Sequence, residues 1–270
     1  MKSSFRIVVS LGLIGTAASH YVINRFIVNN TVSNDFEYVR PYISNVTGDE
    51  IWYGILNPNR DPTNLDFRCG PNGTITGNLT KTATVRAGDT VGFRLGEPHF
   101  KYLNYPYDVP RIYHPGPGSV WLSKSPSDNL NTYSGDGDWF KILEIIGRTE
   151  QSMPVLSDST YAPLYQWGLY VARDWNFTIP ATTPPGKYLL RFEQVYPVKS
   201  YHPNDNYLGP EYFVNCAQID IVNDEQIGSP GPVAKIPGVY ERWQPEFQSE
   251  PWDKNSTSTF KYPGPPVWQG

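Results

Sequence analysis

Hydrophobic and polar residues alternate along several short stretches of this chain. The stretch TATVRAGDTVGFRL (82–95) contains two such runs around an Ala-Gly-Asp turn, and a period of two is typical of β-strands with one buried face. Similar runs follow at 118–124, 175–180, 186–195 and 216–222. Gly- and Pro-rich loops separate them, and no long stretch shows the periodicity of an amphipathic helix. The pattern predicts an all-β protein, a two-sheet antiparallel sandwich of the immunoglobulin or fibronectin kind.

Long loops and a patterned tail complete the expected organisation. The loops cover 100–117, 147–168 and 198–210, and loops of this length in a compact domain are usually functional or disordered. The stretch KILEIIG (141–147) fits either a strand or a brief helical turn. We expect a single domain over 20–270, in which the Pro-, Tyr- and Trp-rich residues 228–270 form a tail wrapped over the sandwich.

Residues 1–19 have the pattern of a secretion signal. Lys2 and Arg6 give a basic start, a short apolar run follows, and small residues precede an expected cleavage after Ser19. The apolar run is shorter than the roughly 20 residues needed to span a bilayer, and no later stretch approaches that length. We therefore expect a secreted, extracellular protein with no membrane partner. A buried N-terminal strand is the alternative interpretation.

Composition narrows the range of partners. Aromatic residues make up 14%, and there are 26 prolines and 23 glycines, which favours a turn-rich sandwich over a helical bundle. The net charge of −4 provides no basic patch, so we expect no nucleic-acid partner. Uncharged ligands such as glycans suit an aromatic-rich, mildly acidic, secreted chain. We expect it to be a monomer.

The cysteines and sequons agree with an oxidising, extracellular compartment. Cys69 and Cys216 are the only cysteines, and one disulfide between them is the economical interpretation. Six Asn-X-Ser/Thr sequons are candidate glycosylation sites. They are Asn29, Asn45, Asn72, Asn78, Asn176 and Asn255.

The chain has only four histidines, and the first has an unusual position. They are His20, His99, His114 and His202. After cleavage, His20 would offer its α-amine and its imidazole Nδ1 to one metal ion. A second imidazole opposite would give three nitrogens in a plane, which suits Cu(II). A surface or hydrogen-bonded role is commoner for any single histidine, and we interpret His99 in that way, as structural.

Several motifs resemble one known family. YHPGPGSVWLSK (113–124) resembles the second-histidine segment of the fungal lytic polysaccharide monooxygenases of auxiliary activity family 9, formerly glycoside hydrolase family 61. HYVINRF (20–26) resembles the family's mature start, LDFRCG (65–70) its first-cysteine segment and FVNCAQIDIV (213–222) a later core strand. The matches run in order along the whole mature chain. They imply a copper enzyme that uses O₂ or H₂O₂ and an external electron donor. Its expected reaction is hydroxylation of C1 or C4 in cellulose or a related β-1,4-glucan, which breaks the glycosidic bond.

The resemblance implies individual roles near the metal. His20 and His114 would bind one copper ion. The family's Gln-X-Tyr pattern before the second cysteine corresponds here to EYF, so Phe213 replaces the axial tyrosine and Glu211 the glutamine. Loss of the axial hydroxyl leaves the nitrogen ligands in place, so copper binding is expected to survive. A carboxylate is anionic unless burial raises its pKa, so Glu211 could shift the potential of the copper, provide a proton or reduce activity.

A second catalytic residue and a substrate surface are also expected. His202 stands nine residues before Glu211, which is the spacing of the family's histidine that handles oxygen intermediates. Alignment from LLRFE (189–193) places Val198 there instead, so His202 qualifies only if the loop holds an insertion. Candidate aromatic residues for stacking on sugar rings, each of which could equally pack within the fold, are Tyr21, Tyr201, Tyr207, Tyr240 and Trp243.

Two alternatives of other kinds remain open at this point. One is a copper-binding protein of the same fold whose altered Glu211 and Phe213 reflect lost or altered oxygenase activity. The other is a non-catalytic glycan-binding sandwich without metal, which leaves the combination of His20 and His114 unexplained. A hydrolase is disfavoured because no pair of carboxylates stands out for acid–base catalysis.

Overall fold

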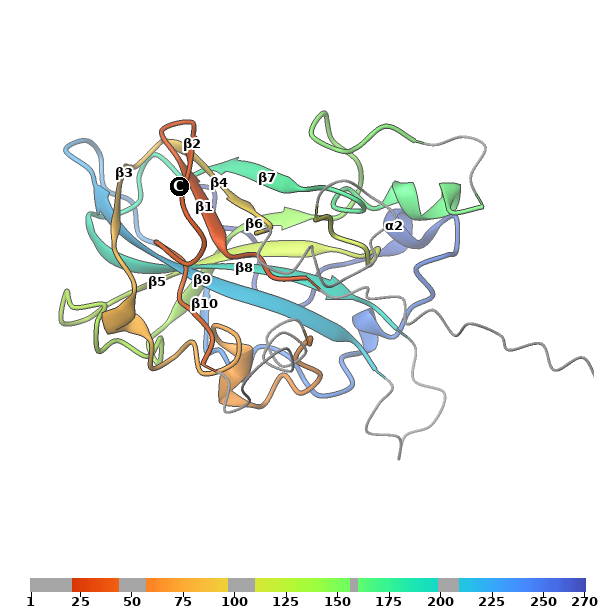
Figure 1. The fold of residues 1–270 in the computed structure, drawn as a ribbon, viewed down its shortest axis with the longest axis horizontal. Helices are drawn as coiled ribbons and strands as arrows, with labels where there is room; N and C mark the ends of the chain where they lie inside the picture. The colour runs from red at the N-terminus through yellow and green to blue at the C-terminus, as the bar shows by residue number, and fades with distance from the viewer. Residues whose placement is uncertain (1–20, 44–56, 97–109, 156–159, 199–208) are drawn as a thin grey trace, which may run out of the picture.

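Ten strands form two stacked sheets in the computed structural model, which describes residues 21–43, 57–96, 110–155, 160–198 and 209–270 (Figure 1). The smaller sheet has the order β2 (Thr31–Val32), β1 (Arg25–Val28), β4 (Thr90–Arg94) and β7 (Asp174–Thr178). The larger has the order β10 (Val233–Ala234), β6 (Trp139–Ile145), β5 (Gly118–Lys124), β8 (Gly186–Tyr196), β9 (Glu211–Val222) and β3 (Ala83–Arg86). The expected two-sheet β-sandwich is confirmed.

Helices in the described residues are few and short. They are η1 (Leu65–Phe67), η2 (Gly77–Leu79), η4 (Ala162–Gln166), η5 (Pro245–Phe247) and α2 (Ser256–Thr259). None of the helices in the described ranges is long and apolar enough to cross a membrane. The stretch 141–147, for which a strand and a helical turn were both open, lies mostly in strand β6.

The predicted strands differ from the structure in two details. All neighbouring strands are antiparallel except β3, which runs parallel to β9 with Ala83 opposite Ile219. This follows from the Ala-Gly-Asp turn, which carries the chain from β3 in one sheet to β4 in the other instead of closing a hairpin. In addition, β9 begins at Glu211, earlier than the expected 216–222, and pairs with β8 over its whole length.

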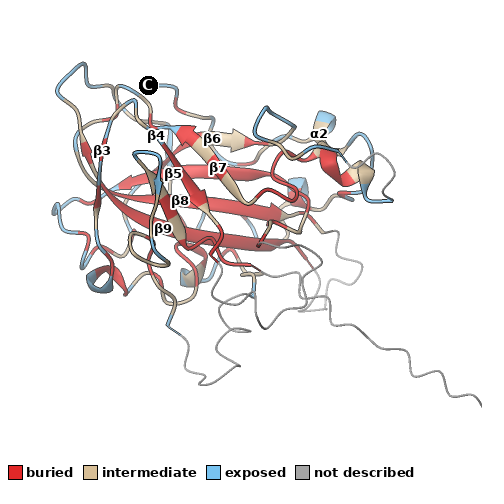
Figure 2. Ribbon diagram, turned by 45° about the horizontal axis from the view of Figure 1, so that its top comes forward, coloured by how far each residue is buried: buried red, intermediate tan, exposed pale blue. Residues whose placement is uncertain are grey.

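Both faces of the larger sheet are buried along its strands β5, β8 and β9, which Figure 2 shows largely red. Alternate residues of a strand point to opposite faces. In β9, Phe213 and Ala217 therefore belong to the core between the sheets, whereas Tyr212 and Val214 belong to a second core on the outer face. The tail covers that outer face with Ile236, Tyr240 and Phe247, against which Phe260 and Tyr262 pack.

The end of the chain lies far from the start of β9. Gly270 lies next to Thr182, in the turn that leads into β8. A side chain at position 270 would place its Cβ atom 3.1 Å from Thr182 Oγ1. Since β8 is an extended strand of 11 residues, its two ends are about 35 Å apart. Gly270 is therefore at the opposite end of the sandwich from Tyr196 and Glu211.

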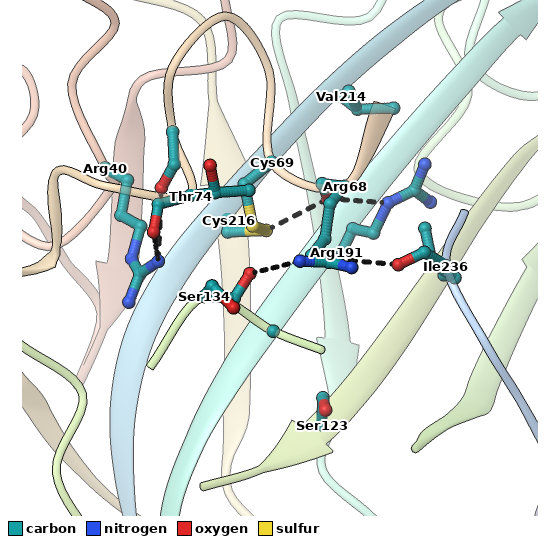
Figure 3. The surroundings of a disulfide bond; sticks show 12 residues. Arg40, Arg68, Cys69, Thr74, Ser123, Ser134, Arg191, Val214, Cys216 and Ile236 are labelled. Carbon is teal, nitrogen blue, oxygen red and sulfur yellow. Dashed lines mark hydrogen bonds between the residues drawn. A yellow bond between two sulfur atoms is a disulfide. The ribbon is translucent and has the colours of Figure 1, made fainter. Parts of the chain in front are cut away.

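A disulfide joins Cys69, just after η1, to Cys216 in the middle of β9. Both cysteines are fully buried, and their Cα atoms are 5.0 Å apart. Figure 3 shows the arginines around the bond: Arg191 donates to the carbonyl of Arg68, and Arg68 donates to those of Ser134 and Ile236. The bridge and these hydrogen bonds attach the segment after η1 to the outer face of the larger sheet.

Removal of the disulfide is expected to lower the free energy of unfolding by about 2–5 kcal/mol, because the bridge closes a long loop in the unfolded chain. The sequence separation of the two cysteines is 147 residues. The measurement is urea denaturation of Cys69→Ala/Cys216→Ala beside the unaltered, oxidised protein. A loss below 1 kcal/mol would contradict this assignment of stability to the bridge.

Candidate metal site

The site forms where β8 ends and β9 begins. The register of these strands places Tyr196 opposite Glu211 and Gln194 opposite Phe213. His114 comes from the segment before β5, and the Gln194 side-chain amide donates a 3.1 Å hydrogen bond to its backbone carbonyl. Three segments that are distant in the sequence therefore bring an imidazole, a carboxylate and two aromatic rings together.

The His114 ring is held between aromatic neighbours. Its centroid lies 4.4 Å from that of Tyr196 with an interplanar angle of 23°, and 5.5 Å from that of Phe213. The side chain is 13% exposed. Stacking fixes the plane of the imidazole, and its Nε2 atom lies 3.4 Å from Glu211 Oε2. A ring held in this way presents one nitrogen in a defined direction.

Glu211 has a carboxylate shared between two partners. Its Oε1 accepts a hydrogen bond from Arg60 Nη2, and its Oε2 faces His114. The carboxylate is only 9% exposed, and this burial raises the pKa of Glu211, whereas the positive charge of Arg60 acts to lower it. The position for which the sequence resemblance implies an amide thus carries a buried, ion-paired acid.

Phe213 and Tyr21 form the inner wall of the site. Their rings stack with centroids 4.2 Å apart, and the Tyr21 hydroxyl donates to Gln194 Oε1. The same Gln194 amide group donates to the His114 carbonyl, so Tyr21 is tied to the segment that carries His114. The centroids of the Tyr21 and His114 rings are 6.5 Å apart.

Two residues expected on a sugar-stacking surface are buried instead, so that expectation is wrong for Tyr21 and Tyr240. Tyr21 packs on Phe213, and Tyr240 lies in the outer core with its hydroxyl donating to Glu193 Oε1 at 2.9 Å. Trp243 remains a candidate because it is half-buried and its ring lies against Gly209, close to the start of β9. The Arg242 guanidinium lies 5.7 Å from the centre of that ring.

The structure shows an exposed aromatic pair that the sequence did not indicate. Tyr161 is 53% exposed and Trp252 is 45% exposed, and their ring centroids are 5.7 Å apart. The side chain of Trp252 lies close to the hydroxyl of Tyr196, whose ring stacks on His114. Tyr161 lies in a long loop and Trp252 in the tail, where no strand pattern indicates which side chains face outwards.

Several predicted residues lie outside the described part of the chain. These are His20, His99, His202, Tyr201, Tyr207 and Asn45. Among the described residues, no group of three or more His, Cys, Asp or Glu is placed to hold a metal ion. The metal-binding potential of the described part therefore rests on His114 together with Glu211. Of the other sequon asparagines, Asn29, Asn78 and Asn255 are exposed, whereas Asn72 and Asn176 are half-buried.

A cavity of about 660 Å³ lies elsewhere, between β6 and β7. It is lined mainly by residues of those strands and by 146–149. It contains none of the predicted metal, catalytic or substrate residues.

Comparisons with known proteins agree on one family. A family model described as Auxiliary Activity family 9 (formerly GH61) matches residues 20–262. The AA9 family lytic polysaccharide monooxygenase U of Thermothielavioides terrestris is 32% identical, and the match covers 96% of this chain and 97% of the relative. The AA9 family lytic polysaccharide monooxygenase D of Phanerodontia chrysosporium is 34% identical, with 93% and 92% covered.

Solved structures support the fold. The chain aligns with CvAA9A at a TM-score of 0.63 and 22% identity, over 92% of this chain and 98% of that one. It aligns with a cellulose-active polysaccharide monooxygenase from M. thermophila at a TM-score of 0.60 and 22% identity, over 93% of this chain and all of that one. At this identity the likeness extends to the sandwich fold alone.

Proposed function

Because the chain belongs to Auxiliary Activity family 9, the family of the lytic polysaccharide monooxygenases, we propose that it is a secreted, copper-dependent member that cleaves β-1,4-glucans oxidatively. Its proposed substrate is cellulose or a related glucan, attacked at C1, at C4 or at both. O₂ or H₂O₂ is the co-substrate, and an external donor supplies electrons. Signal removal after Ser19, a monomeric state and a single domain over 20–270 belong to the same proposal.

The observation that carries the proposal is the environment of His114. Its Nε2 is held by ring stacking beside a carboxylate, and Tyr21 lies against the same cluster. Tyr21 directly follows His20 in the sequence, so the expected mature chain reaches this cluster one residue after its N-terminal histidine. Two imidazoles and an amine are a donor set that suits Cu(II).

We assign the copper to the α-amine and Nδ1 of His20 and to Nε2 of His114. When bound, copper supplies the one-electron redox chemistry by which oxygen or peroxide is activated. The protein orients the His114 imidazole through Tyr196 and Phe213, and Phe213 provides an apolar side where the family pattern has a hydroxyl. Glu211 is the acidic group of the described site, with His202 proposed as a second catalytic side chain.

A copper-binding protein with altered oxygenase activity is the second candidate, and the Glu211 carboxylate favours it. A buried carboxylate beside the copper favours Cu(II) electrostatically, which slows a reaction that requires reduction. Product analysis distinguishes the two functions. Microcrystalline cellulose incubated with the copper-loaded chain and ascorbate is expected to release C1- or C4-oxidised oligosaccharides. Copper binding without oxidised products would support the second candidate.

An extra residue before His20 is expected to weaken Cu(II) binding by at least tenfold, because the α-amine is then converted to a peptide nitrogen and the chelate is lost. Calorimetry should compare the mature chain with one carrying a single added glycine. Equal affinities would show that the N-terminal amine is not a ligand.

Removal of the exposed indole in Trp252→Ala is expected to weaken adsorption to cellulose about five- to tenfold, as expected for loss of about 1–1.5 kcal/mol of ring stacking. Copper affinity should stay within twofold, because among the described residues Trp252 lies next to Tyr196 and not next to His114 or Glu211. Pull-down isotherms give the adsorption constant. Leu79→Ala, which alters another exposed apolar side chain, is the matched control. Unchanged adsorption would remove Trp252 from the proposed substrate surface.

A further inference from the structure

We propose that Arg60 is a positioning residue of the metal site, which holds the Glu211 carboxylate beside His114 Nε2 and compensates its charge. The inference rests on the proposed function in taking His114 Nε2 as a copper-binding atom. Arg60 belongs to neither of the motifs that carry the two histidines, and it stands 151 residues before its partner.

Arg60 is placed by a β-bridge. Asn59 and Tyr212 exchange two backbone hydrogen bonds, of 2.9 and 2.8 Å, in an isolated antiparallel pairing. In such a pairing the residue after one partner faces the residue before the other, so Arg60 lies opposite Glu211. The Asn59 side chain also accepts a 2.7 Å hydrogen bond from the backbone N–H of Asp61, which fixes the turn after Arg60.

The pairing leaves one oxygen of Glu211 for each neighbour. Oε1 accepts from Arg60, and Oε2 lies 3.4 Å from His114 Nε2. A carboxylate that is 9% exposed is costly without a counter-charge, and the Arg60 guanidinium is the cation paired with it. Arg60 is itself 35% exposed, so its own charge remains partly hydrated.

The carboxylate is close enough to act on a metal held by His114. Two donors that share an ion through bonds of about 2 Å lie about 2.8 Å apart at right angles and about 4 Å apart on opposite sides. The separation of 3.4 Å between Nε2 and Oε2 falls within this range. A copper ion held by Nε2 would have the Glu211 carboxylate close to it, and Arg60 would compensate part of that negative charge.

Loss of the guanidinium should shift the preference of the site toward Cu(II). A carboxylate without its cation attracts the doubly charged ion more than the singly charged one. In Arg60→Gln we expect the ratio of Cu(II) to Cu(I) affinity to rise about tenfold, which corresponds to a reduction potential lower by about 59 mV. The Cu(II) EPR spectrum should change while its nitrogen couplings remain, because the variant alters neither histidine.

The test is a double-mutant cycle on the mature chain that begins at His20. Reduction potential and EPR spectrum are measured for the unaltered chain, Arg60→Gln, Glu211→Gln and the double variant. If Arg60 acts through Glu211, Arg60→Gln has little effect once residue 211 is an amide. Arg60→Lys, which keeps the charge, should have a potential close to that of the unaltered chain. If Arg60→Gln folds poorly, Arg60→Lys is the test, and a clearly lowered potential in it would contradict the role of the charge.

The control is Arg86→Gln, which removes an exposed arginine–carboxylate ion pair with Asp224 near the opposite end of β9. It should leave the potential unchanged. An unchanged potential in Arg60→Gln, or an equal shift in the Glu211→Gln background, would overturn the role of Arg60. Absence of a nitrogen-coupled Cu(II) spectrum in the unaltered chain would instead overturn the proposed function, so the two failures are distinguishable.

Discussion

His114→Ala is expected to weaken Cu(II) binding by at least a hundredfold and to abolish the release of oxidised oligosaccharides. Residues that only support a metal ligand typically contribute 10- to 100-fold in affinity, so loss of a ligand should cost at least the upper value. Calorimetry with Cu(II) measures the first effect and product analysis on cellulose the second. The remaining amine and imidazole of His20 should retain weak binding.

The control for this variant is His99→Ala, which removes a histidine that we interpret as structural. It should bind Cu(II) as the unaltered chain does, provided that circular dichroism shows it to be folded. His114→Gln keeps most of the side-chain volume between Tyr196 and Phe213, so it separates loss of the nitrogen from loss of packing. Tight binding by either His114 variant would rule out His114 as a ligand.

Glu193→Ala is expected to lower the free energy of unfolding by about 3–5 kcal/mol, because it leaves a buried guanidinium without its partner. Glu193 and Arg191 are both fully buried and lie 2.6 Å apart between Oε2 and Nη2. Its Oε1 atom also accepts hydrogen bonds from the hydroxyls of Tyr240 and Tyr262, each at 2.9 Å. The carboxylate thus joins β8 to two points of the tail.

Urea denaturation measures this loss, with Glu225→Ala as the control because Glu225 is exposed. A surface change of that kind should alter stability by less than about 0.5 kcal/mol. Arg191→Met in the Glu193→Ala background should recover part of the loss, since it removes the uncompensated charge. A loss below 1 kcal/mol in Glu193→Ala would show that the ion pair is not a major source of stability.

The alternation of residue types predicted the strands because it reflects local geometry. It could not show that β3 and β4 lie in different sheets, since a turn of the same composition can close a hairpin or cross between layers. Nor could it show that Tyr240 is buried. An aromatic side chain suits a glycan-binding surface and a core equally well, and here the tail packs Tyr240 against Phe67 and Tyr212.

In the site, too, short motifs predicted single residues, whereas contacts between distant segments could not be predicted. His114 and Glu211 were predicted because each belongs to a short motif with a fixed spacing. The contact of Arg60 with Glu211 could not be predicted, because it depends on the bridge between Asn59 and Tyr212, and no feature of the segment around residue 60 identifies this distant partner. Trp252 was missed for a related reason, as its contact with Tyr196 exists only once the tail is in place.

Gly270 is a suitable point for attaching the protein to a surface. Gly270 lies beside Thr182, about 35 Å along β8 from the strand ends that hold Tyr196 and Glu211. An affinity tag or a surface anchor attached after Gly270 would therefore leave the proposed copper site facing solution. Immobilised through that end, the protein could be titrated with copper or studied on an electrode without blocking access to His114. A purification tag at the other end would need complete removal up to His20 before any such measurement.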